Sequence, residues 1–195
     1  MKKSEETRQD ILQEAYHLIY TKGYQSTSID DIITATRVTK GAFYYHFQNK
    51  DEMGLAMINE VMYPKMHQSF IEPIENSQSP AEDLHGMVSY LLLDETIFQP
   101  NYGCPIGNLI QEMSLINEQF NETLSLLTNQ WEDAIVKCIN RGKKAGLIKA
   151  ETKSKQVAYF IISGYWGIRN FGKLQRSNAP YKVFLKELKI YLKSL

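Results

Sequence analysis

The chain has 195 residues, of which 43% are apolar, and its 22 basic residues balance 22 acidic residues. This length and apolar content suit a small N-terminal module followed by a larger folded body, and no apolar run is long enough to span a membrane. The neutral balance excludes a protein that coats nucleic acid through bulk positive charge.

The first ten residues, MKKSEETRQD, lack the hydrophobic segment of a secretory signal. The two cysteines, Cys104 and Cys138, give neither a disulfide framework nor a metal-binding spacing. We therefore expect a reduced, cytoplasmic protein without a metal or a cofactor.

Apolar residues at helical spacing predict a first helix over residues 4–22, closed by Gly23. Ser28, with Asp31 three residues later, is typical of a helix N-cap, and it predicts a short helix that ends near Thr36.

Thr39 is placed to cap a second short helix over residues 40–46, and Asn49 caps a third that opens at Lys50. The 40–46 helix is unusually rich in hydrogen-bond donors and aromatic rings for two turns. Base edges in the major groove are read by such side chains. The segment therefore predicts a helix-turn-helix that binds DNA.

Periodic apolar residues predict helices over the rest of the chain as well, and the fold class is all-α with about nine helices. Pro64 should kink or end the helix that opens at Lys50. The further predicted helices cover 81–97, a short segment opening at Pro105, 117–144 closed by Gly146, 154–173 and 180–194.

The 154–173 helix is apolar on two sides, which indicates two packing partners. One is the core of its own chain, and the other is a second subunit, with Gly164 and Gly167 permitting close approach. In the last helix we expect Phe184, Leu188, Tyr191 and Leu195 to face inward, while a lysine face is left to solvent. The lysines are a solvated face or, as the alternative, a second nucleic-acid surface.

The run Thr39 to Phe47, TKGAFYYHF, followed by Lys50, closely resembles the recognition stretch of the tetracycline-repressor (TetR) family. The match extends upstream through Arg8, Ile11, Leu12, Ala15, Gly23, Tyr24 and Ser28–Ile32. The rest of the chain fits the family as an all-helical domain, and GCPIGNLIQEMS resembles one subgroup of these regulators.

The resemblance implies a three-helix DNA-binding domain over residues 1–49 and a helical effector-binding and dimerisation domain over residues 50–195. It also implies a homodimeric repressor that a small ligand releases from a roughly palindromic operator. Lys40 should reach base edges, and Tyr44 should contact a thymine methyl group or a phosphate. The expected DNA-contact residues are Thr27, Ser28, Thr39, Lys40, Gly41, Tyr44, Tyr45, His46 and Lys50.

The charge balance, Asp30 and His46 each bear on how this segment would bind DNA. Residues 1–53 hold seven bases and eight acids, a net charge of −1, so binding must rest on the placement of donors. Asp30 stands where some members of the family place a base-reading arginine, so an operator sequence cannot be transferred. His46 contacts a phosphate or, alternatively, has a structural role.

The resemblance also implies an effector site inside the helical body. We expect a mostly apolar, ring-containing ligand, since few of the candidate lining residues are charged. The candidates are Met57, Met62, Met66, Phe70, Met87, Leu91, Asn108, Gln111, Glu112, Met113, Trp131, Trp166 and Asn170. Asn108, Gln111 and Glu112 lie at near-neighbour helical positions after Pro105, and we expect one or two of them to turn inward and orient a polar end of the ligand. The alternative is that these side chains simply fill the core.

We predict no catalytic residues, because the sequence lacks a Gly-rich phosphate loop, GxSxG and HExxH. Cys104 is a redox-sensing thiol or, as we expect, a small buried side chain, because no basic neighbour in the sequence lowers its pKa. Two rival functions stay open: a small-molecule carrier or enzyme with a vestigial helix-turn-helix, and a constitutive DNA-binding regulator without effector.

Overall fold

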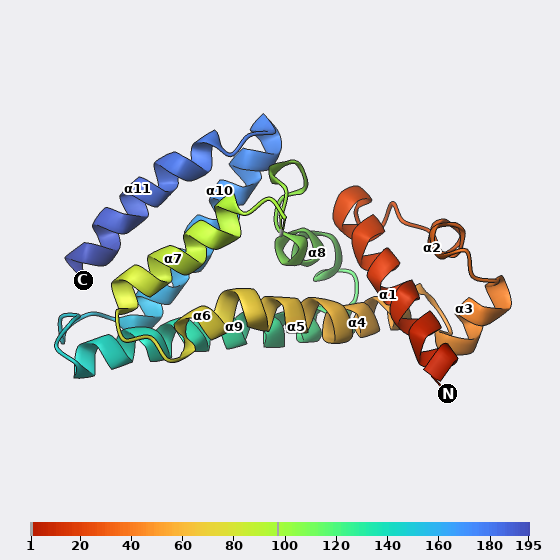
Figure 1. The fold of residues 1–195 in the computed structure, drawn as a ribbon, viewed down its shortest axis with the longest axis horizontal. Coiled ribbons are helices and arrows are strands. Elements are labelled where there is room, and N and C mark those ends of the chain that lie inside the picture. Colours follow the sequence, from red (N-terminus) through yellow and green to blue (C-terminus); the bar gives the residue numbers. More distant parts are fainter. Residues whose placement is uncertain (1, 97) are drawn as a thin grey trace. The chain divides into compact units, whose positions relative to one another are not determined.

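The computed structural model describes residues 2–96 and 98–195, and in these residues all regular structure is helical (Figure 1). The described helices, in chain order, are α1 Lys2–Lys22, α2 Ile29–Thr36, α3 Lys40–His46, α4 Lys50–Met57, η1 Ile58–Met62, α5 Tyr63–Met66, η2 His67–Ile71, α6 Glu72–Glu75, α7 Pro80–Leu93, η3 Pro100–Tyr102, α8 Pro105–Met113, α9 Glu118–Lys144, α10 Ser154–Gln175 and α11 Ala179–Ser194. The segments from α4 to α6 follow one another without a break. Counted as one helix, and leaving out the short 3₁₀ turn η3, they bring the described part of the chain to nine helices, as predicted.

The chain forms two compact units whose residues interleave along the sequence. The first unit contains the residues through Lys65 together with Asn108–Ser125, and the second contains Met66–Gly107 and Leu126–Leu195. This division follows packing, so it differs from the functional boundary between residues 49 and 50, which stays a prediction.

In the first unit, α1 packs against α2, α3 and α4. Its core includes Ile11 and Leu12 of α1, Ile32 of α2, and Phe43 and Phe47 at the end of the helix-turn-helix, all at most 1% exposed. Burying these side chains against α1 holds α2 and α3 in place, because helices of 8 and 7 residues are too short to be stable alone.

The helix that opens at Lys50 does not end at Pro64, one of the two outcomes that the sequence predicted there, because helical segments follow through Glu75. Two π-helical segments, η1 and η2, end two residues before Pro64 and Pro73, respectively. In each case the residue before the proline donates its amide five residues back, from Tyr63 to Ile58 O and from Glu72 to His67 O. The wide turns thus carry the backbone past the missing donor and the bulky ring of each proline.

The second unit packs α7 and α10 against α11, and α6 and η2 against α7 (Figure 1). The helix predicted over 81–97 ends at Leu93, because the Asp94 side chain accepts from both the amide and the hydroxyl of Thr96 and replaces helical bonding by a turn. Residue 97 lies outside the described residues.

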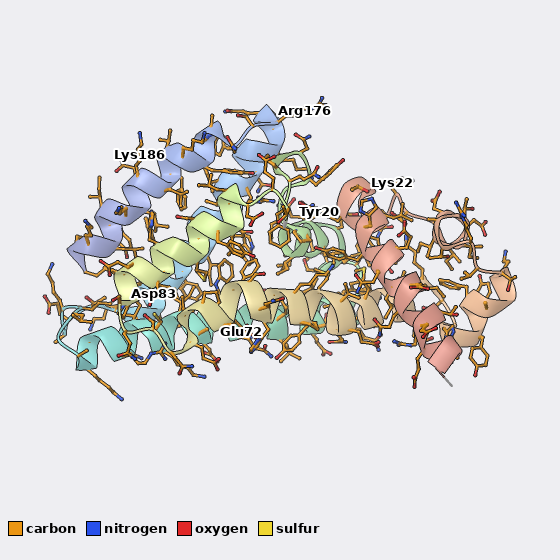
Figure 2. All side chains as sticks on the ribbon, in the orientation of Figure 1. Tyr20, Lys22, Glu72, Asp83, Arg176 and Lys186 are labelled. Carbon is orange, nitrogen blue, oxygen red and sulfur yellow. The ribbon has the colours of Figure 1, made fainter. Side chains whose placement is uncertain are left out.

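The inward face of α11 differs from the predicted one. The side chains that are buried are Tyr181, Leu185, Leu188 and Leu192, whereas Phe184, Tyr191 and Leu195 are only partly buried. Lys186 points away from the body (Figure 2). A stripe shifted by one residue still satisfies helical spacing, so the sequence alone could not select between the two faces.

Candidate nucleic-acid interface

Helix α3 is anchored by two aromatic side chains that fix which face meets solvent. Phe43 and Phe47, one helical turn apart, are buried and their ring centroids lie 5.7 Å from each other. Side chains on the other face must therefore point outward. Tyr45 is 77% exposed and Tyr44 is 46% exposed, and Lys40 is exposed as well.

The N-terminus of α3 is capped as predicted. The Thr39 hydroxyl oxygen accepts the amide of Ala42 over 3.1 Å. A hydroxyl that accepts in this way still has its own hydrogen to donate, so the exposed Thr39 can serve both the cap and an external acceptor.

Gly41 follows in the first turn of α3 and has no steric reason inside the protein to be glycine. A Cβ built on it would meet only the Thr39 hydroxyl, at 4.0 Å, and its φ angle is not in the left-handed region. Glycine is a poor helix former compared with alanine. Glycine at this exposed position leaves room beside α3 for the close approach of another molecule.

Lys40 and Asp30 form an exposed, loose ion pair between α3 and α2. The Nζ of Lys40 lies 3.9 Å from Oδ1 of Asp30. The Lys40 side chain is 67% exposed and the Asp30 side chain is 81% exposed. A pair of this kind contributes little to stability, but it places a negative charge beside the lysine that should approach DNA.

Thr27 and Ser28 do not suit the DNA-contact role predicted for them. Thr27 is fully buried, and its hydroxyl donates to Gly23 O over 2.8 Å. Both donors of Ser28 are given to Asp31 Oδ2, the amide at 2.8 Å and the hydroxyl at 2.6 Å. The capping box that the sequence indicated for α2 thus consumes the groups that were expected to hold phosphate.

The carboxylate of Asp31 is stabilised by the same bonds. The hydrogen bonds from the Ser28 side chain and then from its backbone hold the pKa of Asp31 below its usual value, and Lys22 and Lys50 add to this.

Lys50 has an internal partner that its predicted role did not include. Its Nζ donates to Tyr24 O over 2.6 Å and lies 4.3 Å from the centroid of the Tyr24 ring. Burial lowers the pKa of Lys50, partly offset by the charges of Asp51, Glu112 and Asp31. The residue therefore ties α4 to the turn before α2, and it has two further N–H groups for a phosphate.

His46, at the end of α3, lies in surroundings that favour the neutral form of its imidazole. Burial, followed by the positive charge of Arg8, lowers the pKa of its imidazole below the usual value. A neutral ring has one N–H donor, which is enough for one hydrogen bond to a phosphate.

Arg37 is a candidate that the sequence reasoning missed. It ends α2 in the left-handed conformation, with a φ angle of 56°, and is exposed in the turn before α3. A non-glycine residue with this backbone geometry is uncommon and points to a local requirement. The signal available in the sequence was an arginine between two capped helices.

The candidate effector residues divide between the two units. Those in the first unit are Met57, Met62, Asn108, Gln111, Glu112 and Met113. Glu112 accepts the amide of Gln25 over 3.0 Å, and the Met113 sulfur lies 3.2 Å from the Gln25 side-chain nitrogen. Gln111 is exposed. Glu112 and Met113 therefore brace the turn before α2, an arrangement that helical periodicity could not reveal.

The candidates in the second unit are Met66, Phe70, Met87, Leu91, Trp131, Trp166 and Asn170. The structure brings three of them together: the Trp131 ring lies 4.9 Å from Phe70 and 6.4 Å from Trp166, between centroids. Asn170 is exposed. An open depression near the end of α7, lined by Ser89, Tyr90, Leu93, Asp94, Glu95 and Thr96, contains none of the candidates.

Cys104 has the basic neighbour that the sequence did not show. Burial is the largest influence and raises the pKa of this thiol, while the amides of Gly107 and Ile106, the charge of Arg169 and the Tyr165 hydroxyl act against it. Cys104 is 4% exposed, so its position agrees with a small buried side chain.

In the part of the chain that the structure describes, no helix is both long and apolar enough to cross a membrane. The same residues include no group of three or more histidine, cysteine, aspartate or glutamate side chains that could hold a metal ion.

Comparison with known proteins agrees with this geometry. Residues 11–57 match the model of the bacterial regulatory proteins of the tetR family, and residues 88–188 match the tetracyclin repressor-like C-terminal domain. The HTH-type transcriptional repressor DhaR of Mycobacterium sp. (strain GP1) is 27% identical over 179 residues, which cover 91% of this chain and 88% of that protein. An uncharacterized HTH-type transcriptional regulator of Lactococcus lactis subsp. lactis is 36% identical over 131 residues, 66% of each chain.

Among solved structures, a TetR transcriptional regulator from Chloroflexus aurantiacus J-10-FL superposes with a TM-score of 0.89 at 24% identity, over 98% of this chain and 96% of that one. The C-terminal family model alone spans more than half of the sequence. The chain therefore belongs to the TetR family of DNA-binding transcriptional regulators.

Proposed function

We propose that this regulator acts as a homodimeric repressor in the cytoplasm, that α3 of each copy enters the major groove of a palindromic operator, and that a small ligand releases it. The observation that supports this most is the outer face of α3, where Lys40, Tyr44 and Tyr45 are exposed. Beside them lies Gly41, where the packing of the protein itself does not require a glycine. A face of this kind offers one cation, two phenols and room for close approach, which is what base and backbone contacts require.

The roles within this face differ. Lys40 reads base edges, and Tyr44 contacts a thymine methyl group or a phosphate, while Thr39, Tyr45 and His46 hold phosphates. Lys50 contributes a phosphate contact only through the N–H groups that Tyr24 O leaves available. Arg37 joins the set as a second exposed cation beside α3. Without a net positive charge in the module, affinity depends on these few placed groups.

The test is binding of the purified protein to the DNA upstream of its own gene, followed by fluorescence anisotropy at several salt concentrations. We expect Lys40→Ala to relax base preference, with a loss of about 1–3 kcal/mol on the best site. Lys137→Ala, which removes an exposed lysine from α9, is the matched control. Parental affinity and base preference in Lys40→Ala would contradict the placement of α3.

The dimer contact we propose is the α10–α11 apolar surface, which we define as Phe160, Phe171, Leu174, Val183 and Ile190. These side chains are between 49% and 81% exposed. The partly exposed Tyr191 ring extends this surface, with its centroid 4.3 Å from that of Phe160. So much exposed apolar area on two adjacent helices favours burial against a second copy.

Gly164 does not serve this contact in the way the sequence suggested. A Cβ built on it would lie 2.9 Å from the Phe184 ring, so this glycine permits α11 of the same chain to pack on α10. Gly167 has open space around it and is exposed, so it remains available for close approach of a partner.

For the effector site we propose the aromatic group of the second unit, centred on Trp131, Trp166 and Phe70. Trp131 and Phe70 are buried, and the rings of all three contact one another in series. Ligand entry beside two indoles should change tryptophan emission. We expect the midpoint of that change to equal the midpoint of DNA release, and release without any change in emission would exclude this location.

A further inference from the structure

Arg169 is an entirely buried arginine at the interior face of α10. Its terminal nitrogens donate to three backbone carbonyls, Phe98 O at 3.4 Å, Gln99 O at 3.3 Å, and Gly103 O. The rings of Phe98 and Tyr181 each have their centroid 5.5 Å from the guanidinium carbon. Within the described residues no carboxylate forms an ion pair with it. In the part of the chain that the structure describes, the positive charge is thus surrounded by dipoles and rings without a counter-ion.

Three nitrogens in this region are buried without a hydrogen-bond partner: Nε of Arg169 and the indole Nε1 atoms of Trp131 and Trp166. Guanidinium and indole nitrogens donate hydrogen bonds and cannot accept them. Buried polar groups are nearly always paired, so an excess of unpaired donors at one place calls for an acceptor.

The donors lie in one neighbourhood. Trp166 and Arg169 are three residues apart on α10, a spacing that places side chains side by side on a helix. The Trp131 and Trp166 ring centroids are 6.4 Å apart. The segment from Gly103 to Gly107 contacts both residues, because Arg169 donates to Gly103 O and a Cβ built on Gly107 would lie 3.9 Å from Trp166 Nε1.

We propose that these donors receive the anionic end of the effector, and that the effector is a carboxylic acid with an aromatic or other apolar body. This inference rests on the proposed effector site and specifies its chemistry. A carboxylate offers two acceptor oxygens to the guanidinium and the indole N–H groups. It also supplies the negative charge that balances the positive charge of Arg169. The rings of Phe70, Trp131 and Trp166 accept the apolar remainder. A cationic ligand would meet the buried guanidinium at close range and is excluded.

This assignment changes the polar anchor expected from the sequence. Asn108, Gln111 and Glu112 were to orient the polar end of the ligand, but Glu112 is engaged by Gln25 and Gln111 is exposed. The residue proposed to bind the polar end of the ligand is therefore Arg169. The helical periodicity of the sequence does not distinguish this residue from the other positions of its helix.

A purely structural reading of Arg169 is that it clamps the Phe98–Gly103 segment. That role satisfies its terminal nitrogens but leaves Nε and both indoles without acceptors. It also predicts no difference between charged and neutral ligands, which makes the two readings separable by experiment.

The experiment measures binding of matched acid and amide pairs to the full-length protein by tryptophan fluorescence and by thermal shift. The probes are benzoate, cinnamate and octanoate, each against its own amide. We expect at least one acid to bind at least about tenfold more tightly than its amide, which corresponds to about 1.4 kcal/mol. Arg169→Met should abolish this preference, Trp166→Phe should reduce it, and Lys186→Met should leave it unchanged.

If Arg169→Met does not fold, the acid and amide comparison on the parent and on Trp166→Phe still decides the matter. Equal affinity for acids and amides in the parent would overturn the inference, as would a folded Arg169→Met that keeps the acid preference. Release of DNA by the neutral compounds alone would overturn it while leaving the proposed function intact. Failure of the proposed function would show separately, as absence of operator binding by the unliganded protein.

Discussion

The ammonium of Lys40 lies 3.9 Å from the carboxylate of Asp30, so the cation best placed to meet DNA has an acid beside it. A phosphate or a base edge that approaches Lys40 must therefore also approach Asp30. We expect Asp30→Asn to tighten binding to all DNA sequences. The slope of the logarithm of the binding constant against the logarithm of the salt concentration should become steeper by about one. Fluorescence anisotropy at two or more salt concentrations checks this, with Glu82→Gln, an exposed acid on α7, as the control. Weaker binding would instead show that Asp30 itself reads a base.

Gly41 provides a second test, because stability and DNA affinity should move in opposite directions. Gly41→Ala should stabilise the free protein by up to about 1 kcal/mol, since alanine is the better helix former and nothing inside the protein opposes its methyl group. The same methyl group should weaken operator binding if the backbone of α3 approaches DNA closely.

Gly86→Ala is the matched control for this change. Gly86 is an exposed helical glycine of α7 with open space around it, so alanine there should stabilise without altering DNA binding. Thermal unfolding by circular dichroism gives the stability, and anisotropy gives the affinity. Unchanged affinity in Gly41→Ala would remove Gly41 from the interface.

His46 should make operator binding depend on pH. Burial and the charge of Arg8 lower the pKa of its imidazole, and a nearby phosphate would raise that pKa again. DNA binding should then take up a proton and tighten as the pH falls from 8 to 6, by at most about tenfold per pH unit. His46→Gln should flatten this dependence, whereas His17→Gln, at an exposed position of α1, should not.

The lowered pKa of His46 affects folding stability in the opposite direction from DNA affinity: stability falls as the pH falls, whereas DNA affinity rises. Because the pKa of His46 in the folded protein is below that of the unfolded chain, the unfolded chain binds the proton first. The contribution of His46 to stability is therefore fully present when the pH is above the pKa of His46 in the unfolded chain. It is lost as the pH falls from that pKa to the lower pKa of the folded protein. Denaturant unfolding of the parent and of His46→Gln at pH 8 and pH 6 measures this difference, and a parent that gains stability relative to the variant at pH 6 would contradict it.

The α10–α11 apolar surface predicts the oligomeric state of its variants. Leu174, 81% exposed, should be covered in the dimer, so Leu174→Glu should give helical monomers with much weaker operator binding. Leu147 is 60% exposed outside this surface, and Leu147→Glu should remain dimeric. Sedimentation at low micromolar concentration distinguishes the two. A parent chain that sediments as a monomer would refute the proposed dimer altogether.

Local signals in the sequence were enough for much of the fold. Caps such as Thr39 and Asn49, and the left-handed Gly146, marked helix ends that the structure confirms. They are reliable because a cap satisfies backbone groups within a few residues of itself. The exposure of Lys40 and Tyr44 likewise followed from a motif confined to two helical turns.

What the sequence could not supply is the packing of distant residues. Glu112 was expected to face a ligand, yet it accepts a hydrogen bond from Gln25, 87 positions away. Arg169 was on no list of candidates, because a charged residue in a helix gives no sign of burial until the three carbonyls that surround it are known. Ser28 was recognised as a cap, but a cap whose hydroxyl is donated to Asp31 has no hydrogen for phosphate.

The π-helical turns ahead of Pro64 and Pro73 have a consequence for how this chain aligns with its relatives. The five residues Ile58, Met62, Met66, Phe70 and Ile74 are all buried, at intervals of four. In a regular α-helix each step of four residues overshoots a full turn by about 40°, so such a series would drift to another face. Wider turns absorb the excess, and each acts as one inserted residue. An alignment with relatives that lack either proline should need a single-residue gap at that place. The distribution of that gap across the family would show in which branch each extra residue was inserted.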